Sequence, residues 1–288
     1  MKVLVIGGTG TVGSLIVEGL EAKGVEVGVH TRDAAKAKAR FPKAAVHTGD
    51  LVEPATVREI FKGHDGVFVL NHTAPTETHE ALMCLDGAVL NGVKKFVYMT
   101  VHDLQKALHL PHFGAKLAVE EALKQSKMEW TVIRPNNFHQ NDYWFKDALL
   151  QHGVYPQPLG SKGLHRVDVR DIAEASVIAL TQSGHAGQVY DLVGPGAVTG
   201  PGCAEIWGKA LGKPINYGGE DMDAWEKMNS QWFPAFIAFD YRLMYEFFQR
   251  EGLLATPQAI ERLTRLLGHA PRSYEAFVNE TAKAWKSE

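Results

Sequence analysis

The chain has 288 residues, of which 45% are hydrophobic and 22% charged, as is ordinary for a globular protein with one large domain or a main domain plus a smaller lobe. A formal net charge of −3, with no basic run longer than Lys94-Lys95, argues against a nucleic-acid surface. No apolar stretch approaches the roughly 20 residues of a membrane helix. The only two cysteines, Cys84 and Cys203, are far apart, so we expect a reduced, cytoplasmic setting.

Short apolar runs alternate with amphipathic patterns through the first two-thirds of the chain. The runs predict strands at 3–6, 25–30, 44–47, 66–70, 95–100 and 130–134. Most of them are nearly continuous in apolar residues, which is typical of strands covered on both faces. Apolar positions at helical spacing, such as Val12, Ile16 and Leu20, lie between them. The alternation predicts an α/β fold with a doubly wound parallel sheet.

The regular alternation of predicted strands and helices ends after Arg134. A glycine-broken loop leads to an amphipathic helix from about Asp168, with Asp171 in its first turn, and GQVYDLVGP reads as a further short strand. From Cys203 onward the chain is largely helical and rich in aromatic residues. This part predicts a smaller, mainly helical C-terminal cap on the same sheet.

The segment VLVIGGTGTVG places a glycine-rich turn directly after the first strand and before the first helix. Such a turn suits a bound pyrophosphate, because glycine allows close backbone approach and the helix N-terminus offers free N–H groups. Hydroxyls of threonine can add donors. We expect the cofactor phosphates to contact Gly7, Thr9, Gly10, Thr11, Val12 and Gly13.

The end of the second strand indicates which dinucleotide is bound. An acidic residue there suits the ribose 2′-hydroxyl of NAD, and an arginine suits a 2′-phosphate. The position holds Thr31 and Arg32, and Lys36 follows one helical turn later. Arg32 and Lys36 favour NADP(H), whereas the neighbouring Asp33 leaves NAD(H) possible. The alternative is that Arg32 and Lys36 are ordinary charged residues on the surface.

Two further loops follow strand ends, where a doubly wound sheet contacts its ligand. Asp50 and Leu51 are expected at the adenine, and Asn71 at the ribose or nicotinamide. We therefore expect an NAD(P)-binding Rossmann domain over residues 1–152, its sheet completed by segments from about 153–195, and a helical substrate lobe over 196–288.

Taken together, six segments resemble the NmrA-like family of atypical short-chain dehydrogenase/reductases: VIGGTGTVG, TRDAAKA, GDL, NGVKKFVYMT, KLAVEEALKQSKMEWTVIRPNNF and VDVRDIAEASVIAL. The resemblance covers most of the chain and is nearest to the branch of quinone reductases, triphenylmethane-dye reductases and NADPH sensors. It implies a Rossmann domain, an NADP preference and a C-terminal lobe that forms a cleft. It also implies that Arg32 and Lys36 clasp the 2′-phosphate and that Pro135, Asn137 and Phe138 lie beside the nicotinamide.

The residues that would carry out the reaction differ from the usual pattern. Short-chain dehydrogenases typically use Tyr-x-x-x-Lys, but His112 stands four residues before Lys116 in this chain. If 111 onward is helical, both side chains share a face. Lys116 is then a candidate for binding the nicotinamide ribose and His112 for relaying a proton, against the alternatives of an exposed lysine and a surface or capping histidine.

Electrophiles that accept hydride readily need little acid catalysis, so an aromatic pocket would suffice. The candidate substrate-pocket residues are Thr100, Asn141, Tyr143, Trp144, Trp225 and Trp232. Each aromatic ring among them is equally well explained as core packing.

We expect an NADPH-dependent reductase of a small planar apolar molecule, with no metal, no nucleic acid and no membrane partner. No three histidines, cysteines or carboxylates show metal-ligand spacing. A non-catalytic NADPH sensor is the alternative, and the missing tyrosine disfavours an epimerase or an ordinary alcohol dehydrogenase. The sequence leaves a homodimer open.

Overall fold

The computed structural model describes residues 1–287, which form two compact units. Unit 1 comprises Met1–Arg134 and Arg170–Tyr190, and unit 2 comprises Pro135–Val169 and Asp191–Glu288. The division differs from the expected boundary at 152, because residues 135–152 fall in unit 2 and the segment 153–195 is shared by both units. The chain therefore crosses between the units three times.

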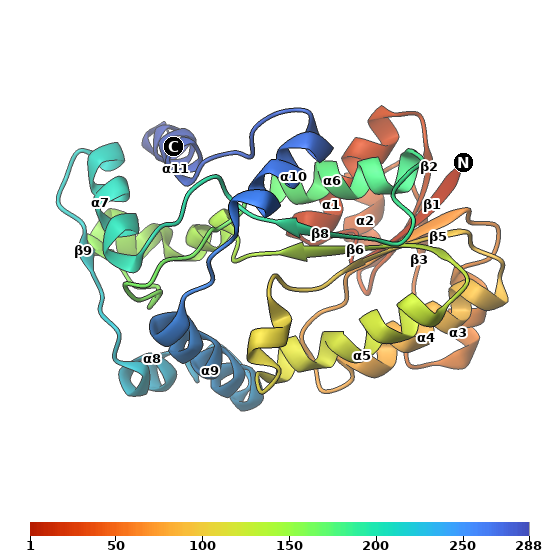
Figure 1. Ribbon diagram of the computed structural model, residues 1–288, viewed down its shortest axis with the longest axis horizontal. Helices are drawn as coiled ribbons and strands as arrows, with labels where there is room; N and C mark the ends of the chain where they lie inside the picture. Colours follow the sequence, from red (N-terminus) through yellow and green to blue (C-terminus); the bar gives the residue numbers. More distant parts are fainter. Residues whose placement is uncertain (288) are drawn as a thin grey trace. The chain divides into compact units, whose positions relative to one another are not determined.

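A parallel sheet forms the centre of unit 1 (Figure 1). Its order within the described residues is β3-β2-β1-β4-β5-β6-β8. The strands are β1 (Lys2–Ile6), β2 (Glu26–His30), β3 (Ala45–His47), β4 (Gly66–Val69), β5 (Lys95–Met99), β6 (Glu129–Pro135) and β8 (Gln188–Leu192). The pairs from β3 across to β6 are all parallel. This confirms the predicted doubly wound α/β fold, and each early strand lies within one or two residues of its predicted bounds.

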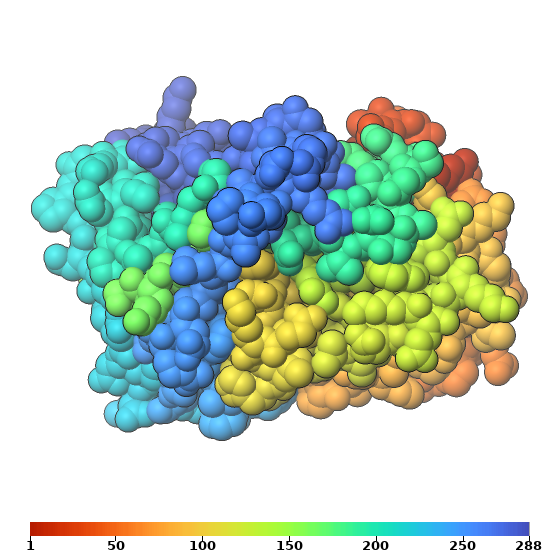
Figure 2. Space-filling model, viewed as in Figure 1, coloured from red at the N-terminus to blue at the C-terminus, as the bar shows by residue number. Residues whose placement is uncertain are grey.

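Helices cover both faces of this sheet. They are α1 (Thr11–Ala22), α2 (Ala34–Arg40), α3 (Pro54–Ile60), α4 (Glu77–Leu90), α5 (Pro111–Gln125) and α6 (Val169–Thr181). In Figure 1, α1 and α6 lie on one face, and α3, α4 and α5 lie on the other. Figure 2 shows side chains filling the space between these layers on the side that it displays.

The alternation of strand residues explains the two layers. Leu4 and Ile6 of β1 pack with apolar residues of α3, α4 and α5 in one buried core. Val3 and Val5 point to the opposite face because successive strand side chains alternate, and they too are fully buried. On that face α1 and α6 approach closely, since a Cβ at Gly19 would lie 3.1 Å from Val177. The strands are thus buried on both faces, as their apolar runs predicted.

Unit 2 is mainly helical, as expected for the C-terminal part. Its helices are α7 (Gly200–Leu211), α8 (Met222–Asn229), α9 (Ala235–Glu251), α10 (Pro257–Leu267) and α11 (Tyr274–Lys286), and β7 (Val154–Tyr155) pairs in parallel with β9 (Asn216–Tyr217). Short irregular helices span η2 (His139–Phe145) and η3 (Ala148–His152), and η1 (Leu104–Ala107) belongs to unit 1.

A buried ion pair lies at the core of unit 2. The Arg166 guanidinium is 2.8 Å from the Asp142 carboxylate, and both side chains are completely buried. The indole of Trp207 donates to the same carboxylate at 2.9 Å, and the hydroxyl of Tyr274 donates to it as well. Since a buried charge is tolerated only when it is paired and hydrogen-bonded, this network ties η2, α7 and α11 into one core.

Among residues 1–287, no helix combines the length and the apolar character needed to cross a bilayer.

Candidate functional site

A cavity of about 1000 Å³ opens on unit 1 where four neighbouring strands end. Its lining follows β1, β2, β3 and β4 in turn, and the chain order reverses between β1 and β4. The crevice at such a reversal is where doubly wound sheets bind their ligands. The lining residues are Ile6, Gly7, Thr9, Gly10, His30, Thr31, Arg32, Asp33, Lys36, Thr48, Gly49, Asp50, Leu51, Leu70, Asn71, His72, Thr73, Thr76 and Glu80.

The turn after β1 requires its glycines. Gly7 has φ +78°, and a Cβ there would lie 2.4 Å from the carbonyl oxygen of Leu70. A Cβ at Gly13 would lie 2.2 Å from the carbonyl oxygen of Gly7, so α1 can begin this close to β1 only without one. Gly10 is the N-cap residue of α1 and the first turn carries no acidic residue. The N-terminal N–H groups of α1 are therefore available to an anion, which fits a pyrophosphate.

The residues after β2 give the cavity a positive end. Asp33 is the N-cap of α2, and its carboxylate accepts from the backbone N–H of Lys36 at 2.9 Å. Thr31 accepts from the Asp33 N–H at 3.1 Å and shares a 3.3 Å hydrogen bond with the hydroxyl of Thr9. The side chains of Arg32 and Lys36 form no ion pair with any residue of the described chain, so their charges are open to a ligand.

The loop after β3 is fixed by local hydrogen bonds. The Asp50 carboxylate accepts from the Val52 N–H at 3.1 Å, and Leu51 is buried beside it. The His30 ring nitrogen Nε2 donates to the Gly49 carbonyl at 2.9 Å, which joins β2 to this loop. Burial lowers the pKa of His30, so its imidazole is neutral at neutral pH. His30 is a lining residue that sequence reasoning did not single out.

Asn71, at the end of β4, carries an unused acceptor. Its Nδ2 donates to the Glu77 carbonyl at 2.7 Å and lies 3.4 Å from the Glu80 carboxylate. Its Oδ1 is buried and has no hydrogen-bond partner among residues 1–287. A buried polar atom without a partner costs free energy, so a ligand donor in this cavity would be favourable at that oxygen. Glu80 also accepts from the Thr76 hydroxyl at 2.6 Å.

The two catalytic candidates lie on one helix, as expected. Helix α5 starts at Pro111, and both His112 and Lys116 are buried on it. The Lys116 ammonium forms a buried ion pair with the Glu77 carboxylate, which no local pattern predicts because the partner lies on another helix. Neither residue is among the described residues that line the cavity, so their roles in cofactor binding and catalysis stay predictions.

Thr100 is buried and hydrogen-bonded inside unit 1. It is 1% exposed, and its hydroxyl donates to the Glu120 carboxylate at 2.8 Å. The same carboxylate forms an ion pair with Arg134. Thr100 is not among the described residues that line the cavity, and its contact with a substrate stays a prediction.

Three of the predicted cofactor residues on α1 are not among the residues that line the cavity, so their contact with the phosphates stays a prediction. Thr11, Val12 and Gly13 occupy the first turn of that helix, and Val12 is buried in the core. Eight other predicted contacts do line the cavity: Gly7, Thr9, Gly10, Arg32, Lys36, Asp50, Leu51 and Asn71.

The loop expected beside the nicotinamide lies in unit 2, where Arg166 holds it. Arg166 Nε donates to Asn137 Oδ1 at 2.8 Å, and Arg166 Nη2 donates to the Phe138 carbonyl at 2.6 Å. Asn141 donates from its backbone N–H to the same carbonyl at 3.3 Å. Hydrogen bonds thus hold Asn137 and Phe138 within unit 2, and Pro135 ends β6. The contact of these three residues with a cofactor stays a prediction.

The remaining substrate-pocket candidates are aromatic residues of unit 2. Trp232 is 76% exposed, and Tyr143 and Trp144 are exposed as well. Trp225 packs edge-on against Tyr245, with 5.1 Å between ring centroids. The high exposure of Trp232 excludes a purely structural core role for it, but the substrate role of all four rings stays a prediction.

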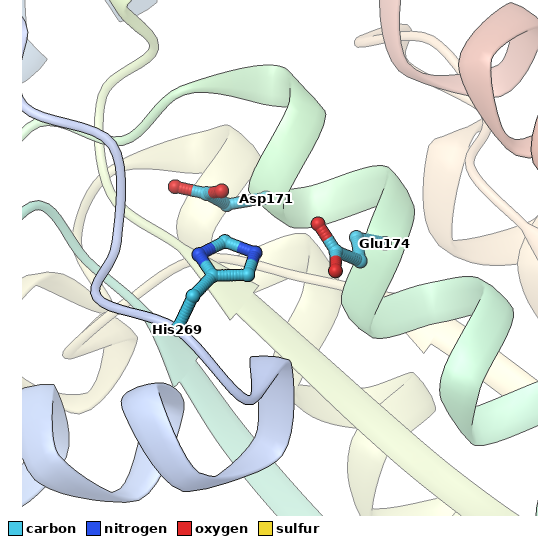
Figure 3. A group of neighbouring side chains, drawn as sticks. All are labelled: Asp171, Glu174 and His269. Carbon is cyan, nitrogen blue, oxygen red and sulfur yellow. The ribbon is translucent and has the colours of Figure 1, made fainter.

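Two carboxylates of α6 project from the same side of the helix (Figure 3). Asp171 lies in the first turn, as predicted, and Glu174 is one turn further on. His269, also drawn in Figure 3, follows α10 of unit 2, and its Nδ1 donates to the Ala270 carbonyl at 2.8 Å. Within residues 1–287, the two carboxylates belong to unit 1 and the histidine to unit 2.

Comparison with known proteins places the chain in a family. A sequence profile of the NmrA-like family matches residues 1–275. The NAD(P)H azoreductase of Xenophilus azovorans is 31% identical over 289 residues, which cover 98% of this chain and 99% of that protein. Among solved structures, the NADPH complex of an NADPH-dependent quinone oxidoreductase from Escherichia coli matches with a TM-score of 0.86 at 21% identity, over 99% of both chains. The triphenylmethane reductase of a Citrobacter species matches with a TM-score of 0.83 at 20% identity, over 97% of this chain and 99% of that one. The structural matches show the shared fold.

Proposed function

Because the chain belongs to the NmrA-like family, we propose that it is an NADPH-dependent oxidoreductase that transfers hydride to a small, planar, apolar electrophile of the quinone, enone, imine or dye type. The cavity at the ends of β1 to β4 carries this proposal. It combines a glycine turn at a helix N-terminus with two cations, Arg32 before α2 and Lys36 in its first turn, that form no ion pair within residues 1–287. The reductases named among its relatives support the same reaction class.

The positive end of the cavity supports NADPH over NADH. A 2′-phosphate would meet Arg32 and Lys36, whose charges no other described side chain neutralises. The carboxylate of Asp33, which would be the natural acceptor for a ribose 2′-hydroxyl, already accepts the Lys36 N–H as a helix cap. NADH remains a weaker second cofactor in this proposal.

The chemistry divides between the cofactor and the chain. When bound, the reduced nicotinamide supplies the hydride. The chain holds the pyrophosphate at Gly7 and Gly10, and Asn71 offers an acceptor to the sugar or carboxamide nearby. Glu77 joins this part of the cavity to Lys116, because its carbonyl accepts from Asn71 while its carboxylate holds the ammonium. The lysine would thus act on the ribose from a fixed position.

The test is NADPH oxidation followed by absorbance, against a panel of quinones, enones, imines and triarylmethane dyes. Turnover above the cofactor-only blank on one or more acceptors is expected. Lys116→Ala should abolish most of it, while Lys62→Ala, which removes an exposed lysine of unit 1, should leave it unchanged. Turnover that Lys116→Ala leaves intact would remove Lys116 from the mechanism.

A specific observation favours a second candidate, a non-catalytic NADPH sensor. The charge of Lys116 on α5 is neutralised by Glu77, and His112 occupies the position where short-chain dehydrogenases typically have a catalytic tyrosine. NADPH binding without turnover on any acceptor in the panel would support the sensor and contradict the reductase. We also predict a cytoplasmic location and leave a homodimer open. The turnover experiments do not test either point.

A further inference from the structure

Three buried nitrogens gather on unit 1 outside the cavity lining. They are Nε2 of His47 and both ring nitrogens of His64, and none has a hydrogen-bond partner within the part of the chain that the structure describes. His64 is only 4% exposed. A neutral imidazole always carries one lone pair that accepts and one N–H that donates, so leaving both unused in the interior costs free energy. A ligand that binds imidazole nitrogens would remove this cost.

Gly28 creates the space that these nitrogens share. It lies inside β2, paired with Leu4 of β1 on one side and Ala45 of β3 on the other. A Cβ on Gly28 would lie 2.6 Å from His64 Nε2 and 3.1 Å from His47 Nε2. A glycine inside a strand weakens it and often marks a site where another group approaches closely. Here the absent side chain lets two imidazole nitrogens converge on one point.

We propose that His47 and His64 form a binding site for a divalent late transition-metal ion, of the class of Zn²⁺, Ni²⁺ and Cu²⁺, with both Nε2 atoms as ligands. The ring centroids are 5.4 Å apart, with 69° between the planes. Two imidazoles bound at about 2.1 Å to one tetrahedral ion have centroids roughly 5 Å apart, close to the observed separation. Imidazole is a preferred ligand for these ions, whereas Mg²⁺ and Ca²⁺ prefer oxygen.

The electrostatic setting agrees with this geometry. Burial lowers the pKa of His64 to about 4, and His47 and Lys2 lower it further, against smaller raising effects of the Phe61 backbone and Glu26. The ring is therefore neutral at pH 7, the form that binds a metal. The Lys2 ammonium would oppose a cation, but it is paired with Glu26 at 3.1 Å, which offsets its charge. His47 is only half-buried, so the ion can enter from its side.

The site lies next to the cavity but is independent of it. His47 pairs in register with His30 and immediately precedes Thr48, both of which line the cavity. Sixteen residues separate His47 from His64 in the sequence, which is not a spacing that indicates a metal site, and the sequence-based expectation of no metal did not consider this pair. Only the fold brings the two rings together. The proposal holds whether or not the protein is a reductase.

The test is calorimetric titration of tag-free full-length protein with Zn²⁺ and Ni²⁺ at pH 7.5, with Mg²⁺ as a negative control. One equivalent of Zn²⁺ or Ni²⁺ should bind, and His47→Gln and His64→Gln should each weaken binding at least tenfold. The matched control is His79→Gln, an exposed histidine of the same unit, which should bind as the parent does. Circular dichroism of each variant shows whether it is folded.

A second measurement avoids substitution altogether. Nuclear magnetic resonance of the ¹⁵N-histidine-labelled parent should show Zn²⁺-dependent shifts at His47 and His64 and little change at His79. Binding that survives in the His47→Gln/His64→Gln double variant would overturn the proposal, since another histidine would then hold the ion. Absence of binding up to millimolar Zn²⁺ and Ni²⁺ would overturn it as well.

Discussion

Arg32 is the single residue on which cofactor choice most depends. Its guanidinium lines the cavity with no partner from the described chain, and a charge-assisted hydrogen bond contributes about 1.5–3 kcal/mol. Arg32→Ala should therefore weaken NADPH binding by about 10- to 100-fold and NADH binding by much less. Arg58→Ala, which removes an exposed arginine of α3, is the control and should change neither. Fluorescence titration measures the dissociation constants of both cofactors. An equal loss of affinity for NADPH and NADH would show that Arg32 does not contact the 2′-phosphate.

Sequence reasoning found Arg32, Lys36, Asp50 and Asn71 because each follows a predicted strand end. It missed His30, the last residue of β2, because a histidine that ends a strand gave no sign that its ring would turn toward Gly49 and the cavity. Glu80 likewise gave no signal, since its place one turn into α4 becomes relevant only when that helix packs beside β4. Residue types at strand ends are predictable, whereas side chains recruited from neighbouring elements depend on packing.

At the scale of elements, the β1–α1 junction limits the choice of residue at Gly13. A Cβ there would lie 2.2 Å from the Gly7 backbone oxygen, which cannot move without opening the turn. Gly13→Ala should lower the unfolding free energy by about 2 kcal/mol and weaken NADPH binding together with it. Gly19→Ala on the same helix meets only the Val177 side chain at 3.1 Å and should be close to neutral. Urea unfolding and NADPH titration test both, and a Gly13→Ala variant with parental stability would contradict the turn geometry.

Helices α4 and α5 are joined by the buried ion pair of Glu77 and Lys116. Removing one partner leaves an uncompensated buried charge, so Glu77→Gln should cost about 3 kcal/mol or more of unfolding free energy. Glu77→Gln/Lys116→Met should recover part of that loss, because it buries no charge. Glu59→Gln breaks the exposed pair with Lys62 and should cost less than about 1 kcal/mol. If Glu77→Gln and Glu59→Gln have equal effects in urea unfolding, the pair is not buried in solution.

The order of elements was largely predictable, and the division into units was not. Continuous apolar runs identified the strands of unit 1 within one or two residues. The two-residue strands β7 and β9 have no periodicity to detect, and they form because the chain of unit 2 brings 154–155 beside 216–217. The assignment of 135–152 to unit 2 follows from contacts such as Arg166 with Asn137 and Phe138, which no local pattern encodes.

At the scale of the whole molecule, the histidines set the response to acid. Burial lowers the pKa of His30, His47, His64, His139 and His185 in the folded chain. An unfolded histidine takes up a proton near pH 6.5, so as pH falls below that value the unfolded state gains protons that the folded state does not. Stability should be constant above pH 7 and should fall by about 1 kcal/mol or more between pH 7 and pH 5.

Urea unfolding at several pH values, with EDTA present to remove bound metals, measures this dependence. A stability that is flat or rises from pH 7 to pH 5 would show that these rings are not held neutral in the fold. His139 offers a separate check in unit 2, because its ring is completely buried and packs near Arg166. Its titration by nuclear magnetic resonance should have a midpoint below pH 6.5.

Every proposed role of unit 1 requires that a pyridine dinucleotide binds in the cavity at the ends of β1 to β4. The most direct measurement is calorimetric titration of the full-length protein with NADPH, NADP⁺, NADH and NAD⁺ under one set of conditions. We predict saturable binding of NADPH at one site per chain, tighter than that of NADH. No saturable heat with any of the four nucleotides would contradict the central claim.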